Sequence, residues 1–98
     1  MAVNSVVSAG CIVSGATVMQ SILFNNVRVN SYAHLEECVV LPGCDIGRHC
    51  VLKKVVLDMG CRVPQGTVIG ENRADDERRF TVTEEGIVLV TQAMLEAL

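Results

Sequence analysis

The chain has 98 residues, half of them hydrophobic and only 3% aromatic, so it should form one small domain with a core of Val, Ile, Leu and Cys side chains. Such β-branched residues favour strands. The formal charge of -3 supplies no attraction to nucleic acid or to an anionic membrane, and without a membrane span or signal peptide we predict a soluble, cytoplasmic protein.

Branched aliphatic residues recur along residues 1–70 in steps of 6, 6 and 5. The twelve positions are Val6, Ile12, Val18, Leu23, Val29, Leu35, Val40, Ile46, Leu52, Leu57, Val63 and Ile69. Three steps make one unit, and the unit occurs four times. A unit of about 17 residues is typical of hexapeptide repeats, in which three short strands form one coil of a parallel β-helix. We therefore predict an all-β protein with about four such coils, whose repeated aliphatic residues point inward.

A second set of positions carries small or compact residues, four places after the first two members of each triple. These are Gly10, Ala16, Val27, Ala33, Cys44, Cys50, Cys61 and Thr67, and the shorter third step places Ile22, Val39 and Val56 at the equivalent position. We predict that this set lies near the corners of the coil, where only a small side chain fits, with Cys44 and Cys61 stacked in one column. Turn-forming residues such as Pro42-Gly43 fall between the strands.

The neighbours His49 and Cys50 suggest a catalytic pair, but the repeat gives both a structural place. Cys50 falls at a corner, and His49 lies just outside the inward set, so we expect it to face solvent. The chain lacks the closely spaced cysteine pairs of a zinc site, and no secretory signal supports disulfides. We predict reduced, buried thiols, no metal site and no catalytic residue. The thiols are Cys11, Cys38, Cys44, Cys50 and Cys61.

Residues 71–98 break the repeat and predict an arm that caps the C-terminal end of the β-helix. The charged stretch 71–80 suggests a short helical turn, Gly86 a turn, and residues 87–90 a strand. Thr91 is a candidate N-cap for a final helix of about seven residues. A helix this short must pack its apolar side chains against the domain.

The N-terminal end has no comparable cap, because Met1 and Ala2 lead directly into the first predicted coil. We expect the chain to be cut from a longer protein. We also expect the unpaired strand edges and aliphatic residues of the first coil to promote self-association.

Four segments carry a family resemblance: "VRVNSY" at 27–32, "VVLPG" at 39–43, "VPQGTVIGEN" at 63–72 and "EEGIVLVT" at 84–91. In this order they resemble the C-terminal portion of bacterial glucose-1-phosphate adenylyltransferase, also called ADP-glucose pyrophosphorylase. The resemblance spans nearly the whole chain and implies a left-handed β-helix. Enzymes of that family use ATP, magnesium and glucose 1-phosphate to make ADP-glucose and pyrophosphate for glycogen synthesis. Their catalytic machinery lies in an N-terminal domain that this sequence lacks, so we expect the chain alone to be inactive and to hold no cofactor.

The resemblance also implies a role in assembling a homotetramer and in binding sugar-phosphate or nucleotide effectors. Arginines that bind the activator in enteric members are replaced here by Met59, Gln92 and Glu96, which leaves the effector's identity open. The remaining effector or interface candidates are Arg78 and Arg79, which match the family pattern, and Arg48, Lys53 and Lys54. All five also suit a plain solvated surface or interdomain salt bridges.

Three other classes use the same fold. Hexapeptide acyltransferases have a His base and often a loop between coils, whereas the spacing here is unbroken. A β-helical carbonic anhydrase needs three His ligands, and only His34 and His49 are present. A purely structural scaffold remains an alternative, because fold alone does not fix function.

Overall fold

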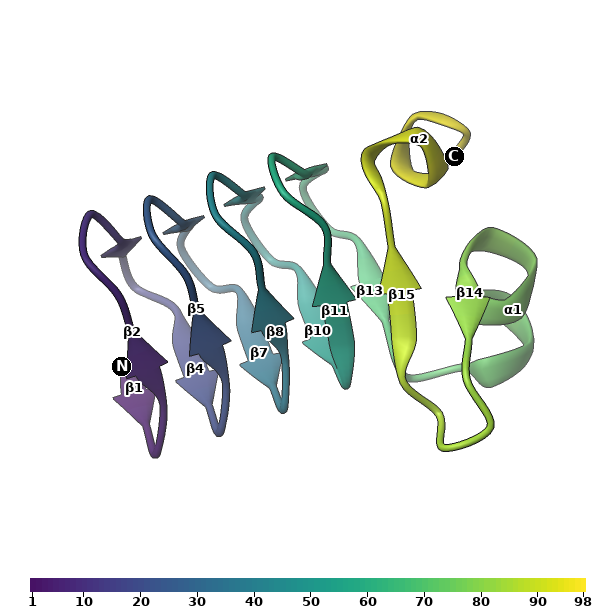
Figure 1. Cartoon of the computed structure of the whole chain (residues 1–98), viewed down its shortest axis with the longest axis horizontal. Helices are drawn as coiled ribbons and strands as arrows, with labels where there is room; N and C mark the ends of the chain where they lie inside the picture. The colour runs from purple at the N-terminus through teal and green to yellow at the C-terminus, as the bar shows by residue number, and fades with distance from the viewer.

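The computed structural model describes all 98 residues as a three-sided coil of short strands with a C-terminal arm (Figure 1). The first sheet contains β1 (Ala2–Val3), β4 (Thr17–Met19), β7 (His34–Glu36), β10 (Val51–Lys53) and β13 (Val68–Ile69). The second contains β2 (Val6–Val7), β5 (Ile22–Leu23), β8 (Val39–Val40), β11 (Val55–Leu57), β15 (Val88–Val90) and β14 (Thr81–Val82). The third contains β3 (Ile12–Val13), β6 (Arg28–Val29), β9 (Asp45–Ile46) and β12 (Arg62–Val63).

Each coil passes through the three sheets in turn, and neighbouring coils pair in parallel. In Figure 1 the strands nearer the viewer run upward and those behind run downward, while the coils advance from the N-terminus on the left to the arm on the right. This winding is left-handed, as the family resemblance implies. It departs from the usual right-handed crossover, and short turns make the connections here.

The interior is filled by the repeated aliphatic residues, and ten of the twelve predicted inward residues are buried. They are Val18, Leu23, Val29, Leu35, Val40, Ile46, Leu52, Leu57, Val63 and Ile69. Cys44 and Cys61 are buried in one corner column, since each precedes a residue of the β9–β12 pair. The predicted β-helix, its core and this column are confirmed.

The predicted inward positions of the first coil are wrong. Val6 and Ile12 are 59% and 51% exposed, because they pair with the outward residues Ile22 and Arg28. Val7 and Val13 hold the inward positions instead, because they pair with the buried residues Leu23 and Val29. Val7 is still 41% exposed, since the first coil has no neighbour on its outer side. The turn after Val13 contains only Ser14 and Gly15, whereas the corresponding turn after Val29 has an additional residue. The first coil is therefore a single residue shorter than the later coils. A slip of one residue exchanges the two faces of a strand.

Two of the predicted corner assignments are also corrected. Cys11, not Gly10, lies in line with Val27, because the shortened first coil moves the register by one. At the third corner the buried residues are Ser21, Cys38 and Val55. The residues predicted there, namely Ile22, Val39 and Val56, point outward from the second sheet. The cause is the short step of five residues, which places the corner three residues after the inward position.

The five thiols are free, as predicted, and four of them are buried. The prediction of burial is wrong for Cys11, which is half-buried because the first coil pairs with a neighbour on one side only. Several donate to backbone carbonyls of the next coil, for example Cys44 Sγ to Asp58 O at 3.1 Å and Cys50 Sγ to Pro64 O at 3.0 Å. Burial raises the pKa of Cys38 to about 11. No three His, Cys, Asp or Glu side chains come together as a metal site. No helix is long and apolar enough to cross a membrane.

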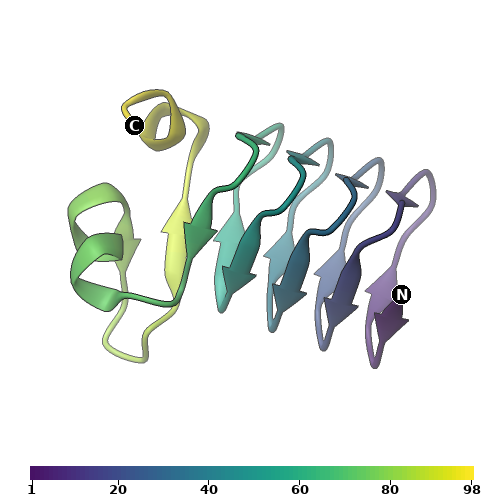
Figure 2. The same ribbon diagram turned by 180° about the vertical axis from the view of Figure 1, so that it is seen from behind.

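The C-terminal arm contains α1 (Arg73–Arg79), the strands β14 and β15, and α2 (Gln92–Glu96). Both views place α1 and β14 beyond the last coil (Figure 2). The strand β15 pairs with β11 and adds a fifth rung to the second sheet. Thr91 caps α2 by accepting from Met94 N. Phe80, Val88 and Leu95 are buried over the open end of the core. The predicted strand and helix are confirmed, whereas the antiparallel strand β14 was not predicted.

Candidate functional site

The five predicted cationic residues lie in three separate places. Lys53 and Lys54 lie where the first sheet turns into the second, Arg78 and Arg79 lie on the last turn of α1, and Arg48 is exposed in the turn between β9 and β10. The first two pairs each line a cavity, and Arg48 lines none. The structure therefore divides four of the five predicted residues between two candidate sites and leaves Arg48 outside both.

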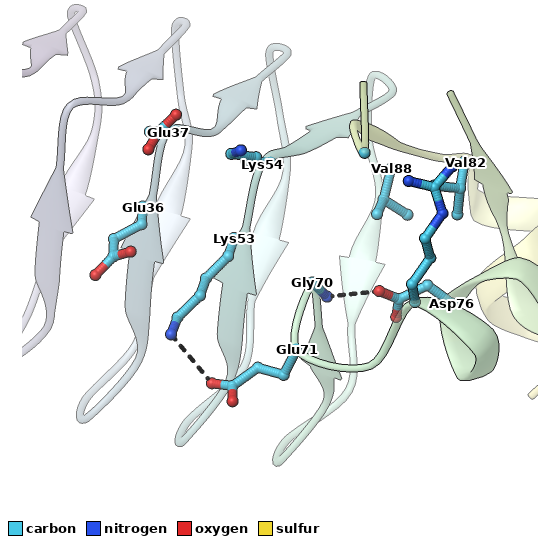
Figure 3. A pocket seen from close by; sticks show the side chains of 11 residues that line it. Glu36, Glu37, Lys53, Lys54, Gly70, Glu71, Asp76, Val82 and Val88 are labelled. Atoms are coloured by element: carbon cyan, nitrogen blue, oxygen red, sulfur yellow. Dashed lines mark hydrogen bonds and ion pairs between the residues drawn. The ribbon is translucent and has the colours of Figure 1, made fainter. Parts of the chain in front are cut away.

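The larger set of charged side chains lines a cavity between the coils and the arm, which we call the arm cavity (Figure 3). Its volume is about 330 Å³. The coils contribute Glu36, Glu37, Lys53 and Lys54, and the arm contributes Gly70, Glu71, Arg73, Asp76, Val82, Gly86 and Val88. Sequence reasoning named only the two lysines, because the arm residues come close only once β15 folds back onto β11.

Most charges in the arm cavity are already paired. Lys53 Nζ lies 3.3 Å from Glu71 Oε1. Arg73 donates to the carbonyl of Thr83 at 3.0 Å and pairs with Glu77 on the outer side of α1. Buried Asp76 accepts from Gly70 N at 3.0 Å, which joins the arm to the last coil. These contacts hold the arm against the coils, and Lys54 is the one cation of the cavity without an ion-pair partner.

A chain of polar contacts continues from this cavity along the first sheet. His34 Nε2 lies 2.9 Å from Glu36 Oε1, and this hydrogen bond lowers the pKa of the Glu36 carboxyl. Burial acts in the opposite direction without reversing the shift, and the positive charge of Lys53 adds to the lowering. Glu36 is therefore a carboxylate at neutral pH.

Lys54 and Glu37 project from the corner because the backbone there is left-handed. Their φ values are +54° and +51°, and Gln20 and Asn4 in earlier coils have φ of +49°. Asn visits this region readily, whereas Gln, Glu and Lys are strained in it. Gln20, Glu37 and Lys54 each lie two residues after an inward position. Asn4 lies two residues after Ala2, which pairs with the inward residue Val18. That regular spacing was the available sequence signal for the corner.

The second cavity lies between the two helices, and we call it the helix cavity. Arg78 and Arg79 line it with Met94, Ala97 and Leu98, and its volume is about 460 Å³. Arg79 donates to the carbonyl of Val68 at 2.6 Å and to Asp76 at 3.2 Å, so its guanidinium is occupied in holding the arm to β13. Arg78 is 76% exposed and bonds only to Asp75 within the same helix. Arg78 is thus the arginine better placed to contact a ligand.

Met59, Gln92 and Glu96, at which the resemblance implies replaced arginines, lie near the last coil. Gln92 Oε1 accepts from Arg62 N at 2.8 Å, and Gln92 Nε2 donates to Glu96 at 3.2 Å. Met59 is 65% exposed. Two of the three side chains therefore bond to each other or to the coil and present no cation.

His49 and Cys50 do not form a catalytic pair. His49 has a left-handed φ of +60° and stacks on Tyr32, with ring centroids 4.9 Å apart. It is exposed, as predicted. The Cys50 thiol points to the interior and donates to Pro64 O, and burial raises its pKa. A protonated thiol is a poor nucleophile.

Residues 1–90 match a family model described as "GlmU-like, C-terminal hexapeptide". The chain belongs to this hexapeptide family. The match covers every coil and the strand β15, so the hexapeptide family's pattern accounts for nearly the whole of the fold.

Several curated relatives are named glucose-1-phosphate adenylyltransferase. The chain is 60% identical over 98 residues to the glucose-1-phosphate adenylyltransferase of Albidiferax ferrireducens, covering 100% of the chain and 23% of the relative. It is 58% identical over 91 residues to the enzyme of that name from Methylococcus capsulatus, covering 93% of the chain and 22% of the relative. Identity to the Pectobacterium carotovorum enzyme is 54% over 98 residues, covering 100% of the chain and 23% of the relative. The match is to the C-terminal parts of these enzymes, and the chain spans about a quarter of their length.

Proposed function

We propose that this chain is the C-terminal oligomerisation and allosteric domain of a glucose-1-phosphate adenylyltransferase. The observation that carries the proposal is the 54–60% identity, along all of the chain, to relatives of that name. The parent enzyme would be a cytoplasmic nucleotidyltransferase that converts ATP and glucose 1-phosphate into ADP-glucose and pyrophosphate. Magnesium and the nucleotide would bind to the N-terminal catalytic domain of that enzyme.

We assign no chemical step to the chain itself. Its thiols donate to backbone carbonyls, and its histidines either stack on an aromatic ring or bond to a carboxylate. Neither arrangement joins a base to an accessible nucleophile. The chain alone should therefore form no ADP-glucose.

The allosteric part of the proposal rests on the two cavities. Sugar-phosphate and nucleotide effectors carry phosphate groups, which guanidinium and ammonium groups bind through charge-assisted hydrogen bonds. Among the cations that line the two cavities, Arg78 in the helix cavity and Lys54 in the arm cavity are the least engaged in contacts within the chain. They are our candidates for contact with an effector.

A domain exchange tests the proposed function. The C-terminal region of the Albidiferax enzyme would be replaced by this chain, and ADP-glucose formation and molecular mass would be compared for the chimera, the native relative and the relative's N-terminal part alone. We expect an active, tetrameric chimera that loses activity when magnesium is chelated. A folded chimera that remains monomeric and no more active than the N-terminal part alone would refute the proposal.

The effector sites are tested in the same chimera. Arg78→Ala should weaken the response to a sugar-phosphate or nucleotide effector at least severalfold and leave the rate without effector unchanged. Lys54→Ala should weaken the same response, and the molecular mass of that variant is measured alongside it. Arg48→Ala is the matched control, because Arg48 is exposed but lines neither cavity. An equal response in all three variants would exclude both sites.

A further inference from the structure

The outer surface of the second sheet carries an unbroken row of aliphatic residues, which we call the aliphatic stripe. It consists of Val6, Ile22, Val39, Val56 and Leu89, which pair in register from coil to coil. These side chains point outward, and three of them are 38–59% exposed. The stripe crosses β2, β5, β8, β11 and β15, which are the strands nearest the viewer in Figure 1.

The fold does not require this row to be apolar. The equivalent outward row of the third sheet is Ile12, Arg28, Asp45 and Arg62, which is mostly charged. The interior is already filled by the inward residues, so the stripe adds nothing to the core. Contiguous exposed apolar surface of this kind marks an interaction site.

Two charged residues lie beside the stripe at the corner that precedes it. Glu37 lies two residues before Val39, and Lys54 lies two residues before Val56. Both are exposed, and neither forms an ion pair within the chain. Both line a shallow hollow next to the stripe, together with Val39, Val56, Glu85 and Ile87. An acid and a base thus lie one coil apart on the same edge of an apolar surface.

We propose that two copies of this chain associate face to face through the aliphatic stripe. The two-fold axis would run parallel to the strands, midway between β8 and β11. Val39 of one copy then faces Val56 of the second, and Ile22 faces Leu89. The same operation sets Glu37 of each copy against Lys54 of the other, which forms two equivalent ion pairs. An isologous contact of this kind uses one patch twice.

The charges select this axis over its alternative. A two-fold axis along the coil direction would place the edge that carries Glu37 and Lys54 against the opposite edge of the partner's stripe, where Leu41 and Asp58 lie. It would also form two equivalent pairs, Lys54 with Asp58, but Asp58 Oδ1 already accepts from Met59 N at 2.8 Å, whereas the Glu37 carboxylate has no ion-pair partner within its own chain. The size of the contact is also suitable. The molecule measures 32 × 24 × 20 Å, so one side offers a planar area of roughly 600 Å², near the lower limit for a specific interface.

This inference deepens the proposed oligomerisation role and is tested on the 98-residue chain by sedimentation equilibrium over a concentration series. We expect a reversible monomer–dimer equilibrium. Glu37→Lys and Lys54→Glu should each weaken the dimer by about tenfold or more, because each places like charges opposite one another. The double exchange Glu37→Lys/Lys54→Glu should restore the dissociation constant to within about threefold. The exchange leaves the backbone unchanged, since both positions already hold a charged residue at similar positive φ.

The control is Ile12→Lys, which removes a similarly exposed aliphatic residue from the third sheet and should leave the dimer unchanged. A chain that stays monomeric at every concentration would overturn the proposal and leave the stripe to another partner. A dimer whose dissociation constant is unchanged by both single exchanges would also overturn the proposal. So would a dimer that the double exchange fails to restore. Because no enzyme assay is used, failure of this proposal is distinguishable from failure of the domain exchange.

Discussion

Replacement of Gly70 by Ala should destabilise the protein at the joint between the coils and the arm. Gly70 has a φ of +96°, and a Cβ placed on it would lie 2.2 Å from the carbonyl oxygen of Lys53. The Gly70 amide also donates to the buried carboxylate of Asp76. Any shift that relieves the clash must therefore weaken a hydrogen bond to a charged acceptor.

The expected cost follows from these two contributions. A non-glycine residue at positive φ costs about 1–2 kcal/mol, and a hydrogen bond to a charged group contributes about 1.5–3 kcal/mol. We therefore expect Gly70→Ala to lower the free energy of unfolding by roughly 3–5 kcal/mol. The measurement is urea denaturation followed by far-ultraviolet circular dichroism.

Substitutions at two other glycines measure the cost of backbone strain and the cost of steric clash separately. Gly66 has a φ of +78°, and a Cβ there would meet nothing within 4 Å, so Gly66→Ala should cost only the conformational 1–2 kcal/mol or so. Gly47 has no positive φ, but a Cβ would lie 2.7 Å from Gln65 N, so Gly47→Ala should cost about 1–3 kcal/mol through overpacking. A loss at Gly70 no greater than the loss at Gly66 would refute the proposed joint.

Three further predictions concern the core, the thiols and the first coil. Ile46→Ala removes a fully buried side chain and should lower the free energy of unfolding by about 2–5 kcal/mol in the same assay; a loss below 1 kcal/mol or so would contradict the inward register. Burial raises the pKa of Cys38 and Cys61 from 9.0 to about 11, so the unfolded state ionises first. The free energy of unfolding should fall as the pH rises from 9 to about 11 and be unaffected by these thiols below 9, and Cys38→Ala should reduce that fall. In dilute solution, where the chain is monomeric, amides of residues 3–12 should exchange with solvent faster than those of the third coil, because Val6 and Ile12 are exposed and the first coil pairs on one side only; equal protection by hydrogen exchange would contradict this.

The periodicity predicted most of the β-helix, because one rule applies to every coil. Three consecutive coils repeat at one constant spacing, and their inward, corner and turn positions follow from any one of them. The rule assigned the wrong register to the first coil, because two of its strands each carry two adjacent aliphatic residues, Val6-Val7 and Ile12-Val13. Hydrophobicity alone therefore fits both registers.

Turn residues carried the missing information about the first coil. Gly10, Asn26, Gly43 and Gly60 all have positive φ, and the first interval between them is shorter by a single residue than the two equal intervals that follow. Alignment on these turns, rather than on the aliphatics, places Cys11 above Val27 and brings Val7 and Val13 inward. The handedness of the turns was thus a stricter constraint than the composition of the core.

The cavities were harder to predict because they depend on contacts between distant segments. The arm returns to the coil through β15, so Arg73 and Asp76 meet Lys53 and Lys54 across about twenty residues of sequence. No local sequence pattern predicts a contact between segments this far apart in the chain. The antiparallel strand β14 has only two residues, too few for a periodic signal.

The stacking of coils also determines how the protein would respond to mechanical force. Hydrogen bonds between neighbouring strands run along the axis of the β-helix, as do the thiol contacts to the next coil. Tension applied between the two ends of the stack loads the rungs in series, and each coil contacts only its neighbours. The coils should therefore detach one at a time, each releasing about 55–60 Å of chain. Pulling would give a low, stepped force profile, in contrast to the single high peak of a fold whose strands are sheared together.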